Sequence, residues 1–350
     1  MISIGFVGTG VIAWAHGLGL RAMIEAGVAD AAVVAVHDVD EGRAAGFAAF
    51  LGAEPVGSVD EVARRCDAVW VCTPTADHVP VVGTLAAAGR AVFCEKPLAP
   101  DLARAEALAA TVARAGVPAQ VGLVLRSTPV FGSLARLLAS GELGPPMTVV
   151  LRDDQYFPVQ GIYGSTWRGR VEVAGGGCLI EHSIHDLDIL RVCLGEVVDL
   201  SARTANFAGH PGVEDVATVA LRFASGASAE LVSVWHDVLS RGSTRRVEVF
   251  CRRGVVWLED DHVGPLHVQT GEGVETRPCP VADWVDALPL ARDDLGLVLR
   301  MYCPADRDFL EAVTAGRAPQ PGFADAVVAH RLVDAAYRSA AAGGAPVVPA

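Results

Sequence analysis

The feature that most constrains the fold is an apolar run that leads without interruption into a glycine-rich turn. Ile2–Val7 predicts a buried strand, Gly8–Ala13 follows it at once, and a helical pattern comes next. Gly8 permits a tight turn, Gly10 lets the backbone approach a pyrophosphate at a helix N-terminus, and Ala13 allows helix and strand to pack closely. This G-x-G-x-x-A arrangement predicts a dinucleotide site, whose contacts we expect from Gly8, Thr9, Gly10, Val11 and Ile12.

A carboxylate farther along the chain supports a dinucleotide and indicates which one. Ala32–Val36 predicts the second strand, and Asp38 follows it, 25 residues after Ala13. A ribose-binding acid is expected roughly 20 residues beyond the turn. An acid at this position repels a 2′-phosphate, so the sequence favours NAD over NADP. The alternative is that Asp38 only caps a helix that begins near Glu41.

The alternation of strands and helices predicts an α/β Rossmann fold with a doubly wound parallel sheet in the first third of the chain. Later strands of this sheet are expected at Ala68–Cys72, Ala91–Cys94 and Gln120–Leu125. From about Leu123 the pattern changes to strands bounded by turns, expected at Met147–Leu151, Ala217–Phe223, Ser228–Val234, Arg246–Phe250 and Val255–Glu259. We therefore expect an NAD-binding domain over residues 1–123, followed over residues 124–350 by an α+β domain with an open, mostly antiparallel sheet. Residues 261–294 are expected to form loops.

The stretch Phe93–Pro97 places charged residues where a buried strand ends. Ligands of parallel sheets bind outside the carboxyl ends of the strands, so Lys96 is expected to project into that crevice. A lysine that leaves bulk water loses its charge easily, which makes Lys96 a candidate proton carrier. The alternative is a surface lysine paired with Glu95. The same edge gathers candidate cofactor contacts, namely Thr73, Pro74, Thr75, His78, Glu95 and Lys96.

A second candidate group lies on a helix predicted over residues 179–194, directly after the glycine run Gly175–Gly177. Glu181, His185 and Asp188 form one stripe of this helix. A carboxylate beside an imidazole can accept and pass on a proton, and the glycines would let a body such as a nicotinamide ring come close. The alternative is an ordinary helical pair of Glu and His. No clear third ligand accompanies them, so no metal is expected.

Composition and charge exclude several classes of protein. A net charge of −13 and a pI of about 5.2 are unsuited to a nucleic-acid backbone or an anionic membrane surface. The apolar stretches are interrupted well short of the ~18 residues of a membrane span, and the N-terminus has no signal-peptide pattern. The eight cysteines include no C-x-x-C pair. We expect a cytoplasmic protein with free thiols.

Together these motifs resemble the Gfo/Idh/MocA family, which includes glucose-fructose oxidoreductase and inositol dehydrogenase. The matching residues are Gly8–Ala13, Thr73-Pro74 with His78, Glu95-Lys96-Pro97, Trp167-Arg168, Gly175–Gly177, His185 with Asp188 and, more weakly, Val213-Glu214-Asp215. The resemblance implies a Rossmann domain followed by an open-faced sheet domain that often forms oligomers. It also implies catalytic roles for Lys96, His185 and the acid at 181, cofactor contacts at Trp167 and Arg168, and a Lys-Pro peptide that can be cis. The family most often has Asp at position 181, whereas this chain has the longer Glu181.

Motifs and resemblance predict an NAD-dependent enzyme that moves a hydride between nicotinamide and a secondary alcohol of a sugar, cyclitol or related polyol. His185 would accept the hydroxyl proton, Lys96 would stabilise developing negative charge, and Glu181 would orient one of them, although Lys96 and His185 could exchange roles. Candidate substrate contacts are Arg126, Tyr156, Trp235 and His236. A homodimer or homotetramer through the C-terminal sheet is expected. The alternatives are an NAD-dependent glycoside hydrolase and a non-catalytic NAD(H)-binding protein.

Overall fold

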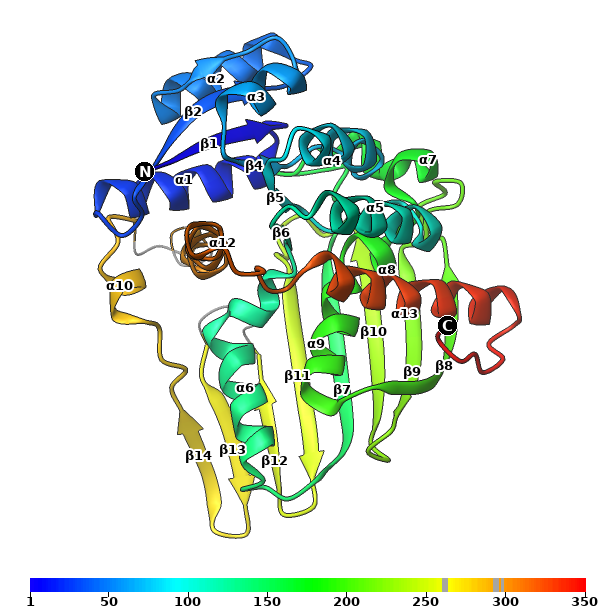
Figure 1. The fold of residues 1–350 in the computed structure, drawn as a ribbon. Helices are drawn as coiled ribbons and strands as arrows, with labels where there is room; N and C mark the ends of the chain where they lie inside the picture. The colour runs from blue at the N-terminus through cyan, green and yellow to red at the C-terminus, as the bar shows by residue number, and fades with distance from the viewer. Residues whose placement is uncertain (260–263, 292–295, 297–298) are drawn as a thin grey trace. The chain divides into compact units, whose positions relative to one another are not determined.

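The chain folds into two compact units (Figure 1). The computed structural model describes residues 1–259, 264–291, 296 and 299–350. The first unit combines residues 1–124 with 282–327, and the second combines 125–281 with 328–350. The sequence predicts the boundary between the two domains at residue 123. The prediction of one continuous second domain over 124–350 differs from this division, because the segment 282–327 returns to the first unit.

A six-stranded parallel sheet forms the centre of the first unit. Its strand order is β3-β2-β1-β4-β5-β6, which is the order of a doubly wound Rossmann sheet and confirms that part of the predicted fold class. The strands are β1 (Ile2–Val7), β2 (Ala31–His37), β3 (Glu54–Pro55), β4 (Ala68–Val71), β5 (Ala91–Cys94) and β6 (Ala119–Val121). The helices that join them are α1 (Val11–Glu25), α2 (Glu41–Leu51), α3 (Val59–Arg65), α4 (His78–Ala87) and α5 (Leu102–Ala115).

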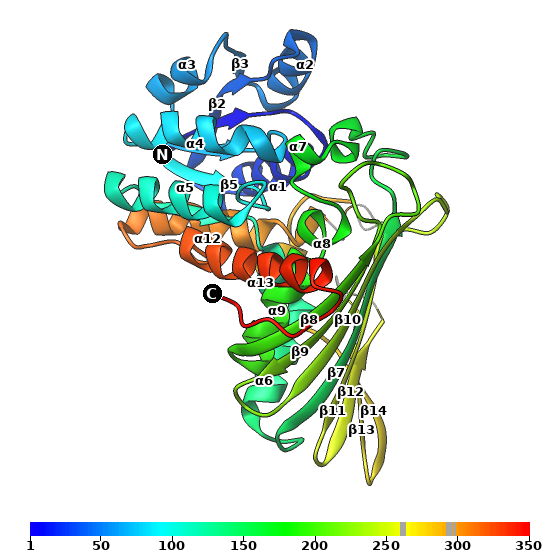
Figure 2. The ribbon, with the colours of Figure 1, turned by 90° about the vertical axis from the view of Figure 1, so that its right-hand side faces the viewer.

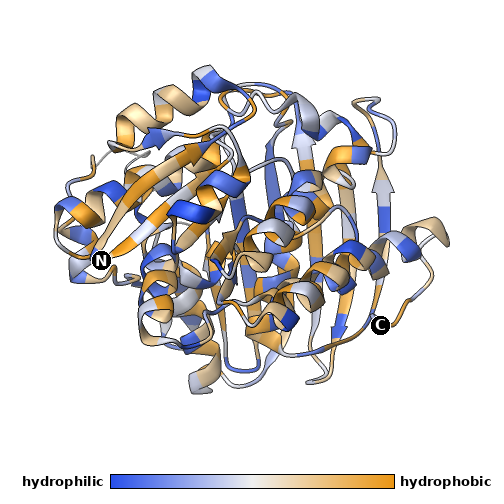
Figure 3. Ribbon diagram, turned by 45° about the horizontal axis from the view of Figure 1, so that its top comes forward, coloured by the Kyte–Doolittle hydropathy of each residue, from blue (hydrophilic) through white to orange (hydrophobic). Residues whose placement is uncertain are grey.

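Helices cover both faces of this sheet, which explains why its strands are hydrophobic along most of their length (Figure 3). One face packs against α1, α2 and the C-terminal helix α12 (Cys303–Ala315), through Phe47 and Phe309 among others. The other face packs against α3, α4 and α5, with Leu85 and Leu108 in its core. The returning segment therefore supplies part of the covering layer, and it also contains the short helix α10 (Asp283–Asp286).

An eight-stranded sheet forms the second unit, in the order β14-β13-β12-β11-β7-β10-β9-β8. All neighbours are antiparallel except β7 and β10, which confirms the predicted mostly antiparallel sheet. The strands are β7 (Pro146–Tyr156), β8 (Val197–Ala205), β9 (Val216–Phe223), β10 (Ser228–His236), β11 (Thr244–Cys251), β12 (Gly254–Leu258), β13 (Leu266–Thr270) and β14 (Gly273–Arg277). Strand β8 and the hairpin of β13 and β14 were not predicted. The hairpin makes the prediction of loops over residues 261–294 wrong in part; residues 261–263 and 292–294 of that stretch lie outside the described residues.

Helices of the second unit lie over one face of this sheet, and among the described residues none lies over the opposite face (Figure 2). The covering elements include α6 (Pro129–Ser140), α8 (Cys178–Glu181) and α9 (Ile184–Leu194), whereas α7 (Val171–Ala174) lies at one end of the sheet (Figure 2). Strand alternation turns Val149 and Leu151 toward the helices and leaves Val150 exposed on the uncovered face. The long helix α13 (Phe323–Ala341) begins in the first unit and continues in the second. Within the described residues, no helix is both long and apolar enough to cross a membrane.

The helix predicted over residues 179–194 is interrupted. It consists of α8 (Cys178–Glu181) and α9 (Ile184–Leu194), and His182 between them has non-helical dihedral angles. Ser183 turns its hydroxyl to Asp153 at 2.9 Å and to Ser233 at 2.7 Å, which anchors the break to the sheet. The predicted stripe of three residues is therefore wrong as a helical pattern, because only His185 and Asp188 share one helix.

Candidate active site

The glycine-rich turn has the geometry that a pyrophosphate requires. Gly8 has a φ of +87°, and a Cβ there would lie 2.7 Å from the backbone of Cys72, so a side chain would disrupt the turn. Gly10 is the N-cap of α1, and a Cβ at this position would meet no atom within 4 Å. Among the described residues, no side chain caps this end of α1. The turn thus offers open space and backbone N–H groups to an anion, and the residues present fit the NAD that the fold implies.

Asp38 is attached to this turn and is not a helix cap. Its Oδ2 accepts hydrogen bonds from the backbone N and the Oγ1 of Thr9, at 2.7 and 2.8 Å. The N-cap of α2 is Asp40, whose side chain accepts from the backbone N of Arg43. The alternative role of Asp38 as a cap is therefore wrong. Its carboxylate lies at the carboxyl end of β2, beside the residues that the turn presents to a cofactor.

His78 connects the loops that follow two neighbouring strands. Its ring is buried, with Nδ1 2.9 Å from the carbonyl oxygen of Pro97 and Nε2 3.1 Å from that of Thr73. Thr75, which is also buried, begins a single 3₁₀ turn over Thr75–Asp77. This arrangement places His78 as a tie between the two loops. Direct cofactor contact by Thr73, Pro74, Thr75 or His78 stays a prediction.

The Glu95-Lys96-Pro97 stretch directly follows β5, as predicted. The Lys96–Pro97 peptide is cis, in agreement with what the resemblance allowed. Glu95 is buried, and its Oε2 accepts a hydrogen bond from the backbone N of Lys96 at 3.3 Å. A glycine is needed nearby, because a Cβ at Gly122 would lie 2.4 Å from Oε1 of Glu95.

A charged cluster that sequence reasoning missed lies behind this stretch. His16 of α1 is 2.7 Å from Asp306 of α12 and 3.0 Å from Glu95, and Trp70 of β4 also donates to Asp306, at 2.9 Å. The available signal was a lone histidine on an apolar helix. Its partner Asp306 is 290 residues away, so no local spacing could indicate the contact.

In the second unit, Glu181 forms an ion pair with a predicted cofactor contact. Nε of Arg168 donates to Oε2 of Glu181 at 3.0 Å, and Nη1 donates to Oγ of Ser165 at 2.9 Å. The same guanidinium stacks 4.4 Å above the ring of Trp167. Glu181 is buried, and the ion pair with Arg168 restricts the orientation of its carboxylate. Arg168 thus pairs with the carboxylate of the glutamate that this chain has in place of the family's more common aspartate.

Arg126 and Asp188 are also joined. Nε and Nη2 of the guanidinium donate to Oδ2 and Oδ1 of the carboxylate, at 2.7 and 2.5 Å, in a two-point pair. His185 is buried in the first turn of α9, one turn before Asp188. The pairing gives both Arg126 and Asp188 a structural role, and the predicted substrate contact by Arg126 stays a prediction.

The remaining substrate candidates lie together at one end of the sheet. Strands β7 and β10 run parallel and pair His236 with Tyr156 at their last positions, one residue beyond Trp235. His236 Nε2 is 3.5 Å from Oδ2 of Asp154, and the ring of Trp235 packs edge-on against Phe157 at 4.9 Å. The strand patterns did not predict this parallel pairing. It brings Tyr156, Trp235 and His236 to the same end of the sheet.

The same end of the sheet contains a buried acidic pair that was not predicted. Arg245 of β11 lies between Asp153 of β7 and Asp186 of α9: its Nε donates to Asp186 at 2.6 Å and its Nη2 donates to Oδ2 of Asp153 at 3.4 Å. Burial raises the pKa of Asp153 well above its usual 3.8. The positive charge of Arg245 lowers this pKa in part, whereas the neighbouring Asp186 raises it further. The raised pKa favours the protonated form of Asp153.

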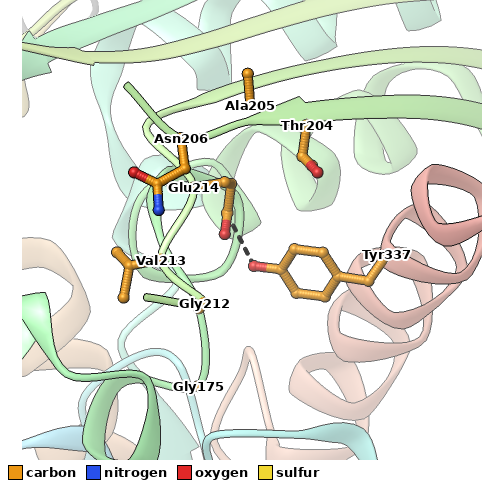
Figure 4. Close-up of a pocket in the computed structure, with 9 residues that line it drawn as sticks. Gly175, Thr204, Ala205, Asn206, Gly212, Val213, Glu214 and Tyr337 are labelled. Atoms are coloured by element: carbon orange, nitrogen blue, oxygen red, sulfur yellow. Dashed lines mark hydrogen bonds between the residues drawn. The ribbon is translucent and has the colours of Figure 1, made fainter. Parts of the chain in front are cut away.

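The glycine run serves a contact within its own unit. A Cβ at Gly177 would lie 1.7 Å from the carbonyl oxygen of Glu214, and one at Gly176 would lie 2.3 Å from Oη of Tyr337. The side chain of Glu214 accepts from the backbone N of Gly177 at 2.8 Å and from Leu179 at 3.0 Å, and Tyr337 donates to it at 2.9 Å (Figure 4). The glycines are thus required by Glu214 and Tyr337, and an approach of nicotinamide stays a prediction.

A cavity of about 390 Å³ lies beside this anchor (Figure 4). Its described lining is Gly175, Gly176, Thr204, Ala205, Asn206, Gly212, Val213, Glu214 and Tyr337, and it includes none of the predicted catalytic residues. Within the described residues, no group of three or more His, Cys, Asp or Glu is arranged to hold a metal ion.

Fold and site together define a Rossmann protein with a dinucleotide-binding turn and a second unit built on a large open sheet. Residues 2–123 match the oxidoreductase family with an NAD-binding Rossmann fold, and residues 131–257 match the C-terminal domain of the same family. The chain belongs to the Gfo/Idh/MocA family of NAD-binding oxidoreductases.

Two relatives named as dehydrogenases cover most of the chain. It is 31% identical over 349 residues to an inositol 2-dehydrogenase of Rhizobium meliloti, covering 97% of each chain. It is 28% identical over 321 residues to a scyllo-inositol 2-dehydrogenase (NAD(+)) of Bacillus subtilis, covering 86% of this chain and 84% of that one. The structure of a levoglucosan dehydrogenase with NADH and levoglucosan has the same fold, with a TM-score of 0.86, 21% identity and 99% coverage of both chains.

Proposed function

We propose that this protein is an NAD-dependent dehydrogenase that oxidises a secondary alcohol of a cyclitol or a sugar-like polyol, or reduces the corresponding ketone. The observation that carries this proposal is the full-length likeness to an inositol 2-dehydrogenase, and the family resemblance implies catalytic roles for Lys96 and His185. The rival functions receive no support from the two relatives cited here, both of which are described as dehydrogenases.

In the proposed mechanism, bound NAD supplies the hydride acceptor and the residues of the chain handle the proton. His185 accepts the proton of the substrate hydroxyl, and Lys96 donates a hydrogen bond to the same oxygen as negative charge develops. Glu181, which is held by Arg168 at 3.0 Å, orients His185 or Lys96. The mechanism requires the Lys96 ammonium and the His185 imidazole to reach one substrate oxygen, and the two can exchange the role of base.

The amino-acid usage of the chain supports a specific role for Lys96. It is the only lysine among the 28 lysine and arginine residues. Arginine stays charged at all accessible pH values, whereas a lysine can lose its proton when it leaves water. All the other residues of this group are arginine. A lysine at position 96 alone is consistent with a side-chain amine that must gain and lose a proton.

We further propose that the uncovered face of the large sheet associates with a second copy of the chain, giving a homodimer or homotetramer. Val150 is 45% exposed on this face, between Glu230 and Glu248 of the flanking strands, and Val232 and Phe250 add partly buried apolar surface. A sheet face of mixed polar and apolar character can bury such residues against an identical face. A cytoplasmic location is consistent with the eight free thiols.

The activity test is a screen of inositols, sugars and related polyols with NAD, in which NADH absorbance is recorded. Lys96→Ala should lower kcat by about 10²–10⁴-fold on the best substrate, while the Kd for NADH changes little. Arg104→Ala, an exposed residue at the start of α5, is the matched control and should leave both values unchanged. A Lys96→Ala enzyme with unchanged kcat would contradict the assignment. A screen in which products are released without accumulation of NADH would favour the hydrolase.

A further inference from the structure

A buried imidazole bridges two acids of the first unit. His16 is 0% exposed; its Nδ1 is 2.7 Å from Oδ1 of Asp306, and its Nε2 is 3.0 Å from Oε1 of Glu95. A neutral imidazole can donate from only one nitrogen, whereas an imidazolium donates from both. Two acidic oxygens at hydrogen-bond distance therefore favour the charged ring.

The local charges are sufficient to keep this ring protonated. Burial by itself lowers the pKa of His16, but the charge and hydrogen bonds of Asp306, and then of Glu95, outweigh burial and raise the pKa from 6.5 to about 10. Burial raises the pKa of Asp306, but its Oδ1 accepts N–H groups from both His16 and Trp70, and two donors favour the carboxylate form. The contacts with Asp306 and Glu95 thus favour the charged form of His16.

Among the described residues, two aromatic rings also pack against His16. The ring contacts Phe93 of β5 at 5.0 Å and Tyr302, just before α12, at 5.1 Å. Two thiols lie near the cluster, and burial raises the pKa of Cys72 well above 9 and that of Cys303 to about 12, so both stay neutral. The acids Asp306 and Glu95 are therefore the groups that decide the charge of His16.

Glu95 contacts both His16 and the backbone of Lys96. Its Oε1 faces His16, its Oε2 accepts from the backbone N of Lys96 at 3.3 Å, and Gly122 leaves just enough space for the carboxylate. We propose that His16 is a positioning residue, held as an imidazolium between Asp306 and Glu95, that orients the Glu95 carboxylate and through it the backbone of Lys96.

Asp306 lies in the segment that returns from the far end of the chain. The orientation of the Glu95-Lys96 stretch thus depends on α12 as well as on β5. The kinetic part of this inference rests on the proposed dehydrogenase function, whereas the charge of His16 and the reactivity of Lys96 can be measured without any substrate.

The first test is the protonation state of His16 in the intact wild-type protein, measured by NMR with ¹⁵N-labelled histidine. The His16→Gln spectrum assigns the signal. Both ring nitrogens of His16 should carry protons from pH 6 to about 9. A His16 ring that is neutral at pH 7 overturns the inference, whether or not a substrate has been found.

The second test compares two variants that each keep one of the contacts. The amide of His16→Gln can replace Nε2 and still donate to Glu95, whereas that of His16→Asn replaces Nδ1 and reaches only Asp306. We expect His16→Asn to lower kcat by about 10–100-fold, since small misplacements near reacting groups cost this much, with an unchanged Kd for NADH. His16→Gln should recover most of the lost kcat. Equal losses in both variants would indicate a purely structural role and overturn the inference.

The third test uses the single lysine as a probe. An amine-specific reagent modifies only Lys96 and the N-terminal amine, and peptide mapping separates the two products. His16→Asn should change the rate of Lys96 modification at least about threefold, whereas His16→Gln should leave it close to that of the wild type. If neither variant alters this rate while both stay folded by circular dichroism, His16 does not act through Glu95 on Lys96.

Discussion

Oδ2 of Asp38 accepts two hydrogen bonds from one residue, the backbone N and the hydroxyl of Thr9, at 2.7 and 2.8 Å. The carboxylate therefore fixes the dinucleotide turn and also places a negative charge at the carboxyl end of β2. These two roles can be separated by a substitution that removes the charge and keeps an acceptor oxygen.

Asp38→Asn should shift the enzyme toward NADP. The amide oxygen can still accept from Thr9, but the repulsion of a 2′-phosphate is lost. We expect the ratio of kcat/KM for NAD to that for NADP to fall on the order of tenfold. Asp40→Asn is the matched control, because Asn is an equally good cap for α2 and the ratio should not change. An unchanged ratio in Asp38→Asn would show that its charge does not select the cofactor.

Gly177→Ala should be among the most destabilising glycine substitutions in the chain. The added Cβ would lie 1.7 Å from the carbonyl oxygen of Glu214, a backbone atom that cannot move without disturbing the Glu214–Tyr337 anchor. We expect a loss of at least about 2 kcal/mol in the free energy of unfolding, measured with urea. Gly46→Ala in α2 meets no atom within 4 Å and should instead stabilise the protein by about 0.5–1 kcal/mol. Similar effects of the two substitutions would contradict the contact.

The buried pair of Asp153 and Asp186 should make stability fall as the pH rises. Burial raises the pKa of Asp153 in the folded state above its unfolded value near 3.8, so the folded protein binds a proton that the unfolded chain releases. The contribution of this proton is complete below pH 3.8 and is lost as the pH rises through the folded pKa. In Asp153→Asn the amide replaces the protonated acid and removes this dependence.

The measurement is the free energy of unfolding of wild type and Asp153→Asn between pH 4.5 and 8. The wild type should lose stability relative to the variant as the pH rises, by at most about 1.4 kcal/mol per pH unit. The control is Asp199→Asn, because the hydrogen bond with Arg222 lowers the pKa of Asp199, so its own pH dependence lies at lower pH. A constant difference between wild type and Asp153→Asn across this range would show that the pKa of Asp153 is not raised in the folded protein.

Local sequence patterns were sufficient for the parts of the site that form within a few residues. The spacing of residues along a strand and the turn after it predicts three of these parts: the turn at Gly8–Ala13, the acid at Asp38 and the Glu95–Pro97 stretch after β5. Such spacing reports backbone geometry and burial directly, so these elements and the parallel sheet were predictable.

Contacts between distant segments were decided only by the tertiary structure. Ser183 leaves the helical pattern because its hydroxyl bonds to Asp153 and Ser233 of the sheet, and no local propensity encodes that choice. In the same way, the His16–Asp306 contact joins residues 290 positions apart. The sequence by itself determined the glycine-rich turn and the parallel sheet, and from them it predicted which residues bind a dinucleotide and carry a proton. The three-dimensional packing determined their partners, because a buried charge is stabilised by whichever opposite charge the fold brings to it, and chain separation does not restrict that choice.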